Sequence, residues 1–318
     1  MKYKKVKNIE EEISVIGFGC WGISGPEFWE GTTDESSIKT IQKAVENGIN
    51  LFDVAPVYGF GHAEEILGTA LKGMRHKVLI ATKCGLVWDE QKRIKRNLTP
   101  KSIFKEIDDS LKRLKTDYID LYQIHWPDST TPIEESMEAM EKLKKEGKIR
   151  AIGVSNYSLE QFKKAVKSAE VVSNQLPFSM VDRHIEEDII PYCLENGYAI
   201  LAYSPLQRGL LTGKVTPDYK FKDDDHRKDN PFFTIENRKK VLLLIDKIRP
   251  IAESHGITVA QLVINWTVHH PGITAALVGT RNVKQAEENF DSLKVELSDE
   301  EMDQINKWVY QTNLEVSY

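Results

Sequence analysis

Eight short apolar segments recur along the chain of 318 residues, and this repetition constrains the fold more than any other feature. They are rich in Val, Ile and Leu rather than alternating with polar residues, which is typical of parallel strands covered on both faces. The segments are ISVIGFG, INLFDVA, KVLIATK, YIDLYQIH, IRAIGVSN, VVSNQLPF, YAILAYSP and ITAALVGT. Amphipathic stretches lie between most of them. The pattern therefore predicts an α/β fold, a closed (β/α)8 TIM barrel, with residues 1–318 forming a single domain.

Helix starts can be predicted between the strands. Pro100 after Thr99 suits the first turn of a helix, where a missing N–H is tolerated. Two other helices are expected to begin with capping boxes, in which a hydroxyl and a Glu or Gln side chain satisfy each other's backbone N–H groups. The two predicted boxes are Thr131 with Glu134, and Ser158 with Gln161.

Charge and composition exclude several classes of function. A formal net charge of −5 offers no basic surface for nucleic acid, and no apolar run is long enough to span a membrane. Cys20, Cys84 and Cys193 show no CxxC spacing, which favours a reducing compartment, so we expect a cytoplasmic protein. His269 and His270 are adjacent and lack a carboxylate at ligand spacing, so no metal site is expected. With no large exposed apolar face evident, a monomer is expected.

Polar side chains stand at the carboxyl ends of six successive strands. In a (β/α)8 barrel these ends meet at one face, where catalytic groups gather. One such residue could occur by chance, whereas six in succession indicate an assembled site. The residues are Asp53, Lys83, His125, Ser155 with Asn156, Gln175, and Tyr203 with Ser204.

Four of these positions suggest proton transfer to a carbonyl oxygen. Tyr58 lies in the Gly-rich loop after Asp53, and a free phenol has a pKa of about 10. A buried Lys83 paired with Asp53 is expected to lower that pKa and to make Tyr58 a general acid. His125 is expected to hydrogen-bond the same oxygen. The hydride must come from a cofactor, because no side chain supplies one.

The sequence resembles the aldo-keto reductases along essentially its whole length, and most closely the bacterial and potassium-channel β-subunit-like branch. The resemblance rests on LFDVAPVYGFGHAEEILG, IATK, LKRLKTDYIDLYQIHWPD, GKIRAIGVSN and ALVGTRNVKQAEEN. Members of that family are (β/α)8 barrels that bind a nicotinamide dinucleotide without a Rossmann domain. The resemblance places the family's catalytic tetrad on Asp53, Tyr58, Lys83 and His125 and implies reversible reduction of aldehydes or ketones.

The resemblance also implies a cofactor site. It assigns the nicotinamide carboxamide to Ser155, Asn156 and Gln175, and stacking on the nicotinamide ring to Tyr203. The segment implied for the pyrophosphate contains Ser204, Pro205, Leu206, Arg208, Gly209 and Lys214. The segment implied for the adenosine contains Gly279, Thr280, Arg281, Gln285, Glu288 and Asn289. Gly19, Cys20 and Trp21, with Asp53, complete the expected contacts, and the thiol of Cys20 raises the question of redox sensitivity.

NADPH is favoured over NADH because Arg281 could stack on adenine and meet a 2′-phosphate. Other branches of the family have a lysine where this chain has Gly279 and an arginine where it has Gln285. The preference for NADPH therefore rests largely on Arg281.

The partner expected of this site is a small-molecule carbonyl substrate. Trp21, Trp88 and Trp126 follow strand ends and are candidates, with Tyr58 and His125, for the substrate pocket. Aromatic or apolar aldehydes fit that lining better than large charged sugars. Specificity is expected in the loops 21–33, 84–98 and 207–233, which composition does not define. The basic stretch EQKRIKRN is either a solvated loop or a contact for an anion.

Two other functions remain open from the sequence. Lys83 could attack a carbonyl as the nucleophile of a Schiff-base aldolase, although pairing with Asp53 would keep it protonated. The chain could also be a cofactor-sensing subunit with slow turnover, like the channel β relatives.

Overall fold

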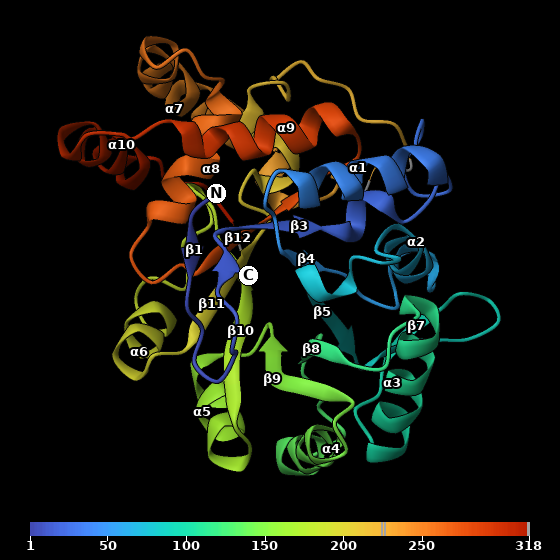
Figure 1. The fold of residues 1–318 in the computed structure, drawn as a ribbon. Helices are drawn as coiled ribbons and strands as arrows, with labels where there is room; N and C mark the ends of the chain where they lie inside the picture. The colour runs from blue at the N-terminus through green and yellow to red at the C-terminus, as the bar shows by residue number, and fades with distance from the viewer. Residues whose placement is uncertain (224, 226, 317–318) are drawn as a thin grey trace.

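The structure, a computed structural model, describes residues 1–223, 225 and 227–316. Eight parallel strands close into a barrel in which neighbours follow one another along the chain. Each of these strands lies within one of the eight apolar segments, apart from the third, which extends one residue beyond its segment to Cys84, so the predicted TIM barrel is confirmed (Figure 1). The barrel strands are β3 (Ile16–Gly19), β4 (Leu51–Asp53), β5 (Leu79–Cys84), β8 (Ile119–Ile124), β9 (Ile149–Ser155), β10 (Val171–Pro177), β11 (Ala199–Tyr203) and β12 (Ala275–Gly279).

Helices surround the barrel and cover its outer face (Figure 1). Their apolar stripes pack on the strands, which is why the strands are apolar on both faces. The helices are α1 (Asp34–Glu46), α2 (His62–Ala70), α3 (Pro100–Leu114), α4 (Ile133–Lys145), α5 (Leu159–Ser168), α6 (Ile189–Asn196), α7 (Ile235–Ser254), α8 (Val259–His269), α9 (Val283–Asp291) and α10 (Asp299–Gln311). Among the described residues, no helix combines the length and the apolar character needed to cross a bilayer.

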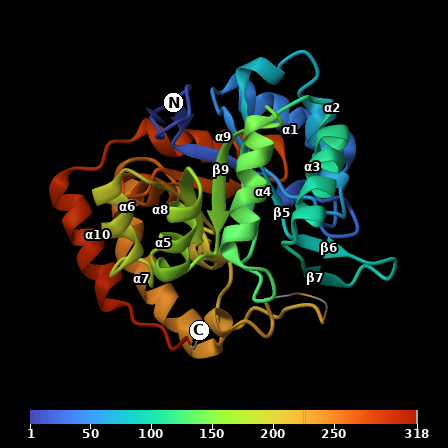
Figure 2. The ribbon, with the colours of Figure 1, turned by 90° about the horizontal axis from the view of Figure 1, so that it is seen from below.

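A short antiparallel hairpin closes the N-terminal end of the barrel. It pairs β1 (Tyr3–Lys4) with β2 (Ile13–Ser14), so the first predicted segment, ISVIGFG, is shared between this hairpin and β3. The side chains of the hairpin that pack against inward-facing side chains of the barrel strands are Val6, Ile9 and Ile13. They close the N-terminal end of the barrel interior. The hairpin β1–β2 and the hairpin that follows β5 lie at opposite ends of the barrel (Figure 2). We therefore expect a functional site at the opposite, C-terminal end.

One of the two predicted capping boxes is present and the other is wrong. Ser158 and Gln161 cap α5 reciprocally, as predicted. At α4 the N-cap position is Pro132, and the Thr131 hydroxyl instead donates a hydrogen bond to Asp128, at 2.9 Å. Because that hydroxyl is engaged by the preceding turn, it does not cap α4. Pro100 occupies the first turn of α3, as predicted.

The loops at the C-terminal end contain structure that the sequence did not predict. The stretch EQKRIKRN belongs to a hairpin that pairs β6 (Leu86–Trp88) with β7 (Ile94–Arg96). The connection 207–233 contains two 3-10 turns, η3 (Gln207–Thr212) and η4 (Pro231–Phe233). Residues 224 and 226 of this connection lie outside the described part of the chain.

Candidate active site

A buried ion pair forms the centre of the site. Lys83, near the end of β5, donates hydrogen bonds to both carboxylate oxygens of Asp53, at 2.9 and 2.8 Å, and to the carbonyl oxygen of Val54, at 3.1 Å. Lys83 is fully buried and Asp53 is 4% exposed. Burial lowers the pKa of Lys83, but the charge of Asp53, with Tyr58, outweighs it, and the net pKa is raised. Lys83 therefore stays an ammonium ion.

Tyr58 reaches the same ammonium group from the loop after β4. Its hydroxyl lies 3.4 Å from Lys83 Nζ. Gly59 lets this loop approach the loop after β3, because a Cβ atom there would lie 2.3 Å from the carbonyl oxygen of Ser24. Burial raises the pKa of Tyr58, while Lys83 acts in the opposite direction. The net direction differs from the sequence-based expectation, because burial outweighs the cation. Tyr58 is thus a protonated phenol at neutral pH.

His125 faces Tyr58 from the end of β8. The two rings meet edge to face, with centroids 5.9 Å apart. Burial, and then the charge of Lys83, hold the pKa of His125 well below its usual range, so the imidazole is neutral at pH 7. The structure thus brings the four predicted catalytic side chains together, and two of them can donate a hydrogen bond to one substrate oxygen.

Two amides hold Asp53 from the opposite side. Gln175 Nε2 donates to Asp53 Oδ1 at 2.7 Å, and Gln123 Nε2 donates to the same oxygen at 3.3 Å. Gln123 is buried inside the barrel and was missed by the sequence analysis. The sequence could have indicated Gln123, because it lies two positions before His125 and alternate residues of an extended strand point to the same face.

The residues expected at the nicotinamide carboxamide form one network. Asn156 Nδ2 donates to the carbonyl oxygen of His125 and to Ser155 Oγ, while Asn156 Oδ1 accepts from the Tyr203 hydroxyl at 2.8 Å. Ser155 Oγ donates to the backbone oxygen of Gln175. Asn156 holds this position with φ of +61°, a strained conformation for a non-glycine residue.

The expected pyrophosphate segment begins with strained backbone. Ser204, Gln207 and Arg208 all have positive φ, followed by Gly209. Such clusters of strained residues occur at ligand-binding loops. The side chains of Arg208 and Lys214 are exposed, whereas Pro205 is buried and Leu206 is half-buried.

The expected adenosine segment lies at the start of α9. The Gln285 side chain accepts a hydrogen bond from the Arg281 backbone N–H, and the exposed Arg281 guanidinium lies 5.2 Å from the ring centroid of Trp29. Asn289 donates to the buried Thr280 hydroxyl, so both side chains support the segment internally. Gly279 is exposed with open space around it, and Glu288 is exposed near Lys284.

Gly19 ends β3, and Cys20 and Trp21 begin the 3-10 turn η1 (Cys20–Ile23), which lies close to this segment. The Cys20 thiol is fully buried, and burial raises its pKa well above the usual range. A buried, protonated thiol is unreactive, which argues against a redox role for its side chain. A Cβ atom at the nearby Gly22 would lie 2.7 Å from the carbonyl oxygen of Thr280, so glycine is required for this close approach.

Aromatic side chains border the site, including three that the sequence analysis missed. Trp21 packs edge to face on Trp29, with centroids 4.9 Å apart. Trp88 of the β6–β7 hairpin contacts Phe60 beside the Tyr58 loop, at 5.5 Å, and Phe60 contacts Phe28. The missed residues Phe28, Trp29 and Phe60 lie within the two loops that also carry Trp21 and Tyr58. Within the described part of the chain, Trp126 makes no ring contact with these side chains and instead lies under Arg96.

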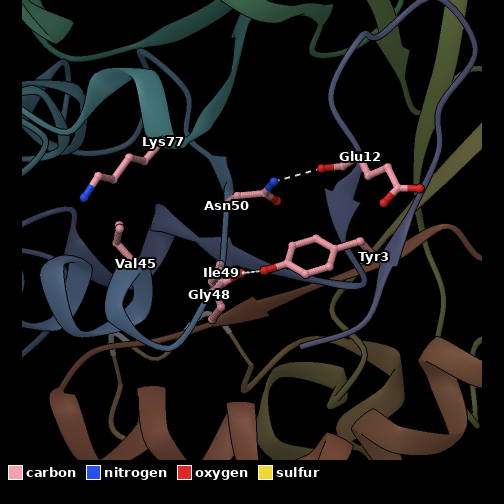
Figure 3. A pocket seen from close by; sticks show the side chains of 7 residues that line it. All are labelled: Tyr3, Glu12, Val45, Gly48, Ile49, Asn50 and Lys77. Atoms are coloured by element: carbon pink, nitrogen blue, oxygen red, sulfur yellow. Dashed lines mark hydrogen bonds between the residues drawn. The ribbon is translucent and has the colours of Figure 1, made fainter.

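A separate cavity of about 410 Å³ lies at the N-terminal end of the barrel (Figure 3). Its lining includes Tyr3, which donates to the carbonyl oxygen of Gly48, and Asn50, which donates to the carbonyl oxygen of Glu12. None of the predicted site residues lines it. We therefore place the candidate active site at the tetrad and not at this cavity.

Comparisons with known proteins show the family to which the chain is similar. A family model described as Aldo/keto reductase family matches residues 15–309. The aldo-keto reductase YhdN of Bacillus subtilis is 41% identical over 309 residues, covering 96% of this chain and 93% of the relative. The NADH-specific methylglyoxal reductase of Escherichia coli is 37% identical over 301 residues, covering 90% and 92%. The structure of the glycerol dehydrogenase AKR11B4 from Gluconobacter oxydans superposes with a TM-score of 0.90 at 38% identity, covering 99% of this chain and 98% of that chain.

Proposed function

The chain belongs to the aldo/keto reductase family, and on that premise we propose that it catalyses the NADPH-dependent, reversible reduction of aldehydes or ketones to alcohols. One observation carries the proposal. The buried Lys83–Asp53 pair lies beside a protonated Tyr58 and a neutral His125, which is the donor set that a developing alkoxide requires.

Each side chain has a separate part in this mechanism. Tyr58 donates its proton to the carbonyl oxygen, and Lys83 stabilises the phenolate that remains. Asp53 keeps Lys83 charged and oriented. His125, being neutral, donates a ring N–H to the same oxygen without adding a charge. The bound nicotinamide supplies the hydride.

The residues present fit a nicotinamide dinucleotide. Gln175 uses its Nε2 within the network, and no hydrogen bond among the described residues uses its Oε1, which leaves an acceptor for a carboxamide N–H. Arg208, Lys214 and Arg281 provide exposed cations for phosphate groups. We favour NADPH because Arg281 can meet a 2′-phosphate, and the NADH-specific relative makes this preference the part to be tested.

The alternatives receive less support. An aldolase needs a neutral amine at Lys83, whereas Asp53 raises the pKa of that group. A cofactor-sensing subunit would need no aligned proton donor, although it would bind the cofactor equally well. A monomer in the cytoplasm remains our expectation for the state and location of the enzyme.

The test is a titration of the protein with NADPH and with NADH, followed through tryptophan fluorescence, and then turnover with a panel of carbonyl compounds. Trp21 and Trp29 lie beside Arg281, so cofactor binding should quench them. We expect tighter binding of NADPH and oxidation of NADPH upon addition of an aldehyde. Binding without turnover across the panel would favour the sensing subunit, and absence of binding would contradict the proposal.

A further inference from the structure

We propose that the enzyme is selective for carbonyl substrates that also carry a carboxylate, and that Arg96 is the residue that recognises it. This inference rests on the proposed function and adds the substrate class. From the sequence, the basic stretch EQKRIKRN could be either a solvated loop or a contact for an anion. The geometry of the β6–β7 hairpin favours an anion contact for Arg96.

The hairpin has an inner face and an outer face. Residues directly opposite on an antiparallel pair point to the same side, and side chains alternate along each strand. Leu86 is opposite Arg96, and Trp88 is opposite Ile94, so these four side chains share one face. Trp88 contacts Phe60, two residues after Tyr58, so this shared face is the one turned toward the loop that carries Tyr58. Val87 and Lys95 are opposite one another and occupy the outer face.

Arg96 is anchored on the loop that directly follows His125. Its Nη1 donates to the carbonyl oxygen of Pro127, at 3.1 Å, and its guanidinium lies 5.1 Å from the ring centroid of Trp126. Trp126 and Pro127 directly follow His125 in sequence. These two contacts hold the guanidinium over the loop that leaves the end of β8, and they leave its other N–H groups available.

The charge of Arg96 has no acidic partner among the described residues. Within the part of the chain that the structure describes, no carboxylate lies within 4.0 Å of its guanidinium. The neighbouring cations differ, because Lys92 pairs with Glu27 at 3.1 Å and Arg93 pairs with Asp89 at 2.8 Å. At the centre of the site, the charges of Asp53 and Lys83 cancel. Among the residues that the structure describes, Arg96 is therefore a cation of the inner face without a paired carboxylate.

The inner face of the hairpin also indicates what the part of the substrate between its carbonyl and its carboxylate should be. Ile94 is 52% exposed and lies beside Arg96 on one strand, with Trp88 opposite. An aromatic or aliphatic body can pack on these side chains while its carboxylate binds the guanidinium, a planar donor suited to two parallel hydrogen bonds. The inferred substrate is an oxo acid with an apolar body between the carbonyl and the carboxylate.

The test compares 4-carboxybenzaldehyde with its methyl ester, methyl 4-formylbenzoate, which keeps the ring and the carbonyl but removes the charge. We expect the wild type to prefer the acid in kcat/KM. Arg96→Gln should lower kcat/KM for the acid by about 10- to 100-fold, mainly through KM, because a hydrogen bond to a charged group is lost. The same variant should change kcat/KM for the ester by less than about twofold.

Lys95→Gln is the matched control, since it removes the same charge from the outer face of the same strand. It should leave both substrates unaffected, and Arg96→Lys should retain part of the preference for the acid. Equal use of acid and ester by the wild type, or equal losses for both in Arg96→Gln, would overturn the inference while leaving the proposed function intact. Failure of the wild type to reduce either compound or any other aldehyde would instead reject the proposed function.

Discussion

Lys83 donates hydrogen bonds to both carboxylate oxygens of Asp53 inside the barrel, where neither charge has appreciable contact with solvent. Asp53 keeps the buried Lys83 charged. In our proposed mechanism Lys83 in turn stabilises the negative charge of the Tyr58 phenolate. Each charge compensates the other. Removing either one therefore leaves its partner as an uncompensated charge in the protein interior.

Lys83→Met should therefore damage both folding and catalysis. Asp53 would be left buried without its cation, which costs about 3–5 kcal/mol of unfolding free energy. The double variant Asp53→Asn with Lys83→Met should recover most of that stability but none of the activity. Urea unfolding and steady-state kinetics on the two variants check this. Recovery of activity in the double variant would show that the ion pair is structural and that Tyr58 does not depend on Lys83.

Tyr58→Phe should reduce kcat for carbonyl reduction by about 100-fold or more, because it removes the proton donor. Binding of NADPH, measured by fluorescence titration, should remain nearly unchanged. Tyr157→Phe is the matched control, since the buried Tyr157 hydroxyl has no hydrogen-bond partner among the described residues and lies outside the tetrad. Unimpaired reduction by Tyr58→Phe would refute its role as the acid.

Arg281→Ala should weaken NADPH binding by about 10-fold or more and NADH binding by about twofold at most, because only NADPH offers a 2′-phosphate to the guanidinium. Lys284→Ala removes an exposed cation of α9, three residues after Arg281, and serves as the control. The measurement is the dissociation constant of NADPH and of NADH for the wild type and both variants. Equal losses for the two cofactors would remove the basis for choosing NADPH.

Loss of the proton from Glu106 should lower the free energy of unfolding as the pH rises. Burial raises the pKa of Glu106 to about 7, although the Gly85 backbone N–H and Ser102 donate hydrogen bonds to its carboxylate. The folded state therefore holds a proton that the unfolded state releases near pH 4.5. Between these values the unfolding free energy should fall with rising pH, by about 3 kcal/mol in total for this one group.

Glu106→Gln should remove that slope and should be more stable than the wild type at pH 8. The control is Glu138→Gln, because Glu138 is exposed on α4. Chemical unfolding at pH 5 and pH 8 gives the comparison. If Glu106→Gln loses stability at pH 8 relative to the wild type, the carboxylate is stabilised in its charged form and the direction of the pKa shift is wrong.

The sequence was sufficient for the barrel because the information was local and repeated. Apolar segments of strand length, separated by amphipathic helices, specify a parallel sheet covered on both faces, and closure then brings all carboxyl ends to one rim. Asp53, Lys83 and His125 could be placed together on that basis alone. Thr131 shows the limit of local patterns, since a correct capping spacing was overridden by its hydrogen bond to Asp128.

By itself, then, the sequence determined the fold, and it predicted the end of the barrel at which Asp53, Tyr58, Lys83 and His125 come together. The tertiary structure decided which groups surround them. It placed Gln123 on Asp53, buried the Cys20 thiol, put Arg96 over Trp126 and brought Phe60 against Trp88. It also decided the net pKa direction for Tyr58, because the balance between burial and a nearby cation depends on distances in three dimensions. Such contacts join residues far apart in the chain or depend on how loops fold, and no periodic pattern encodes them.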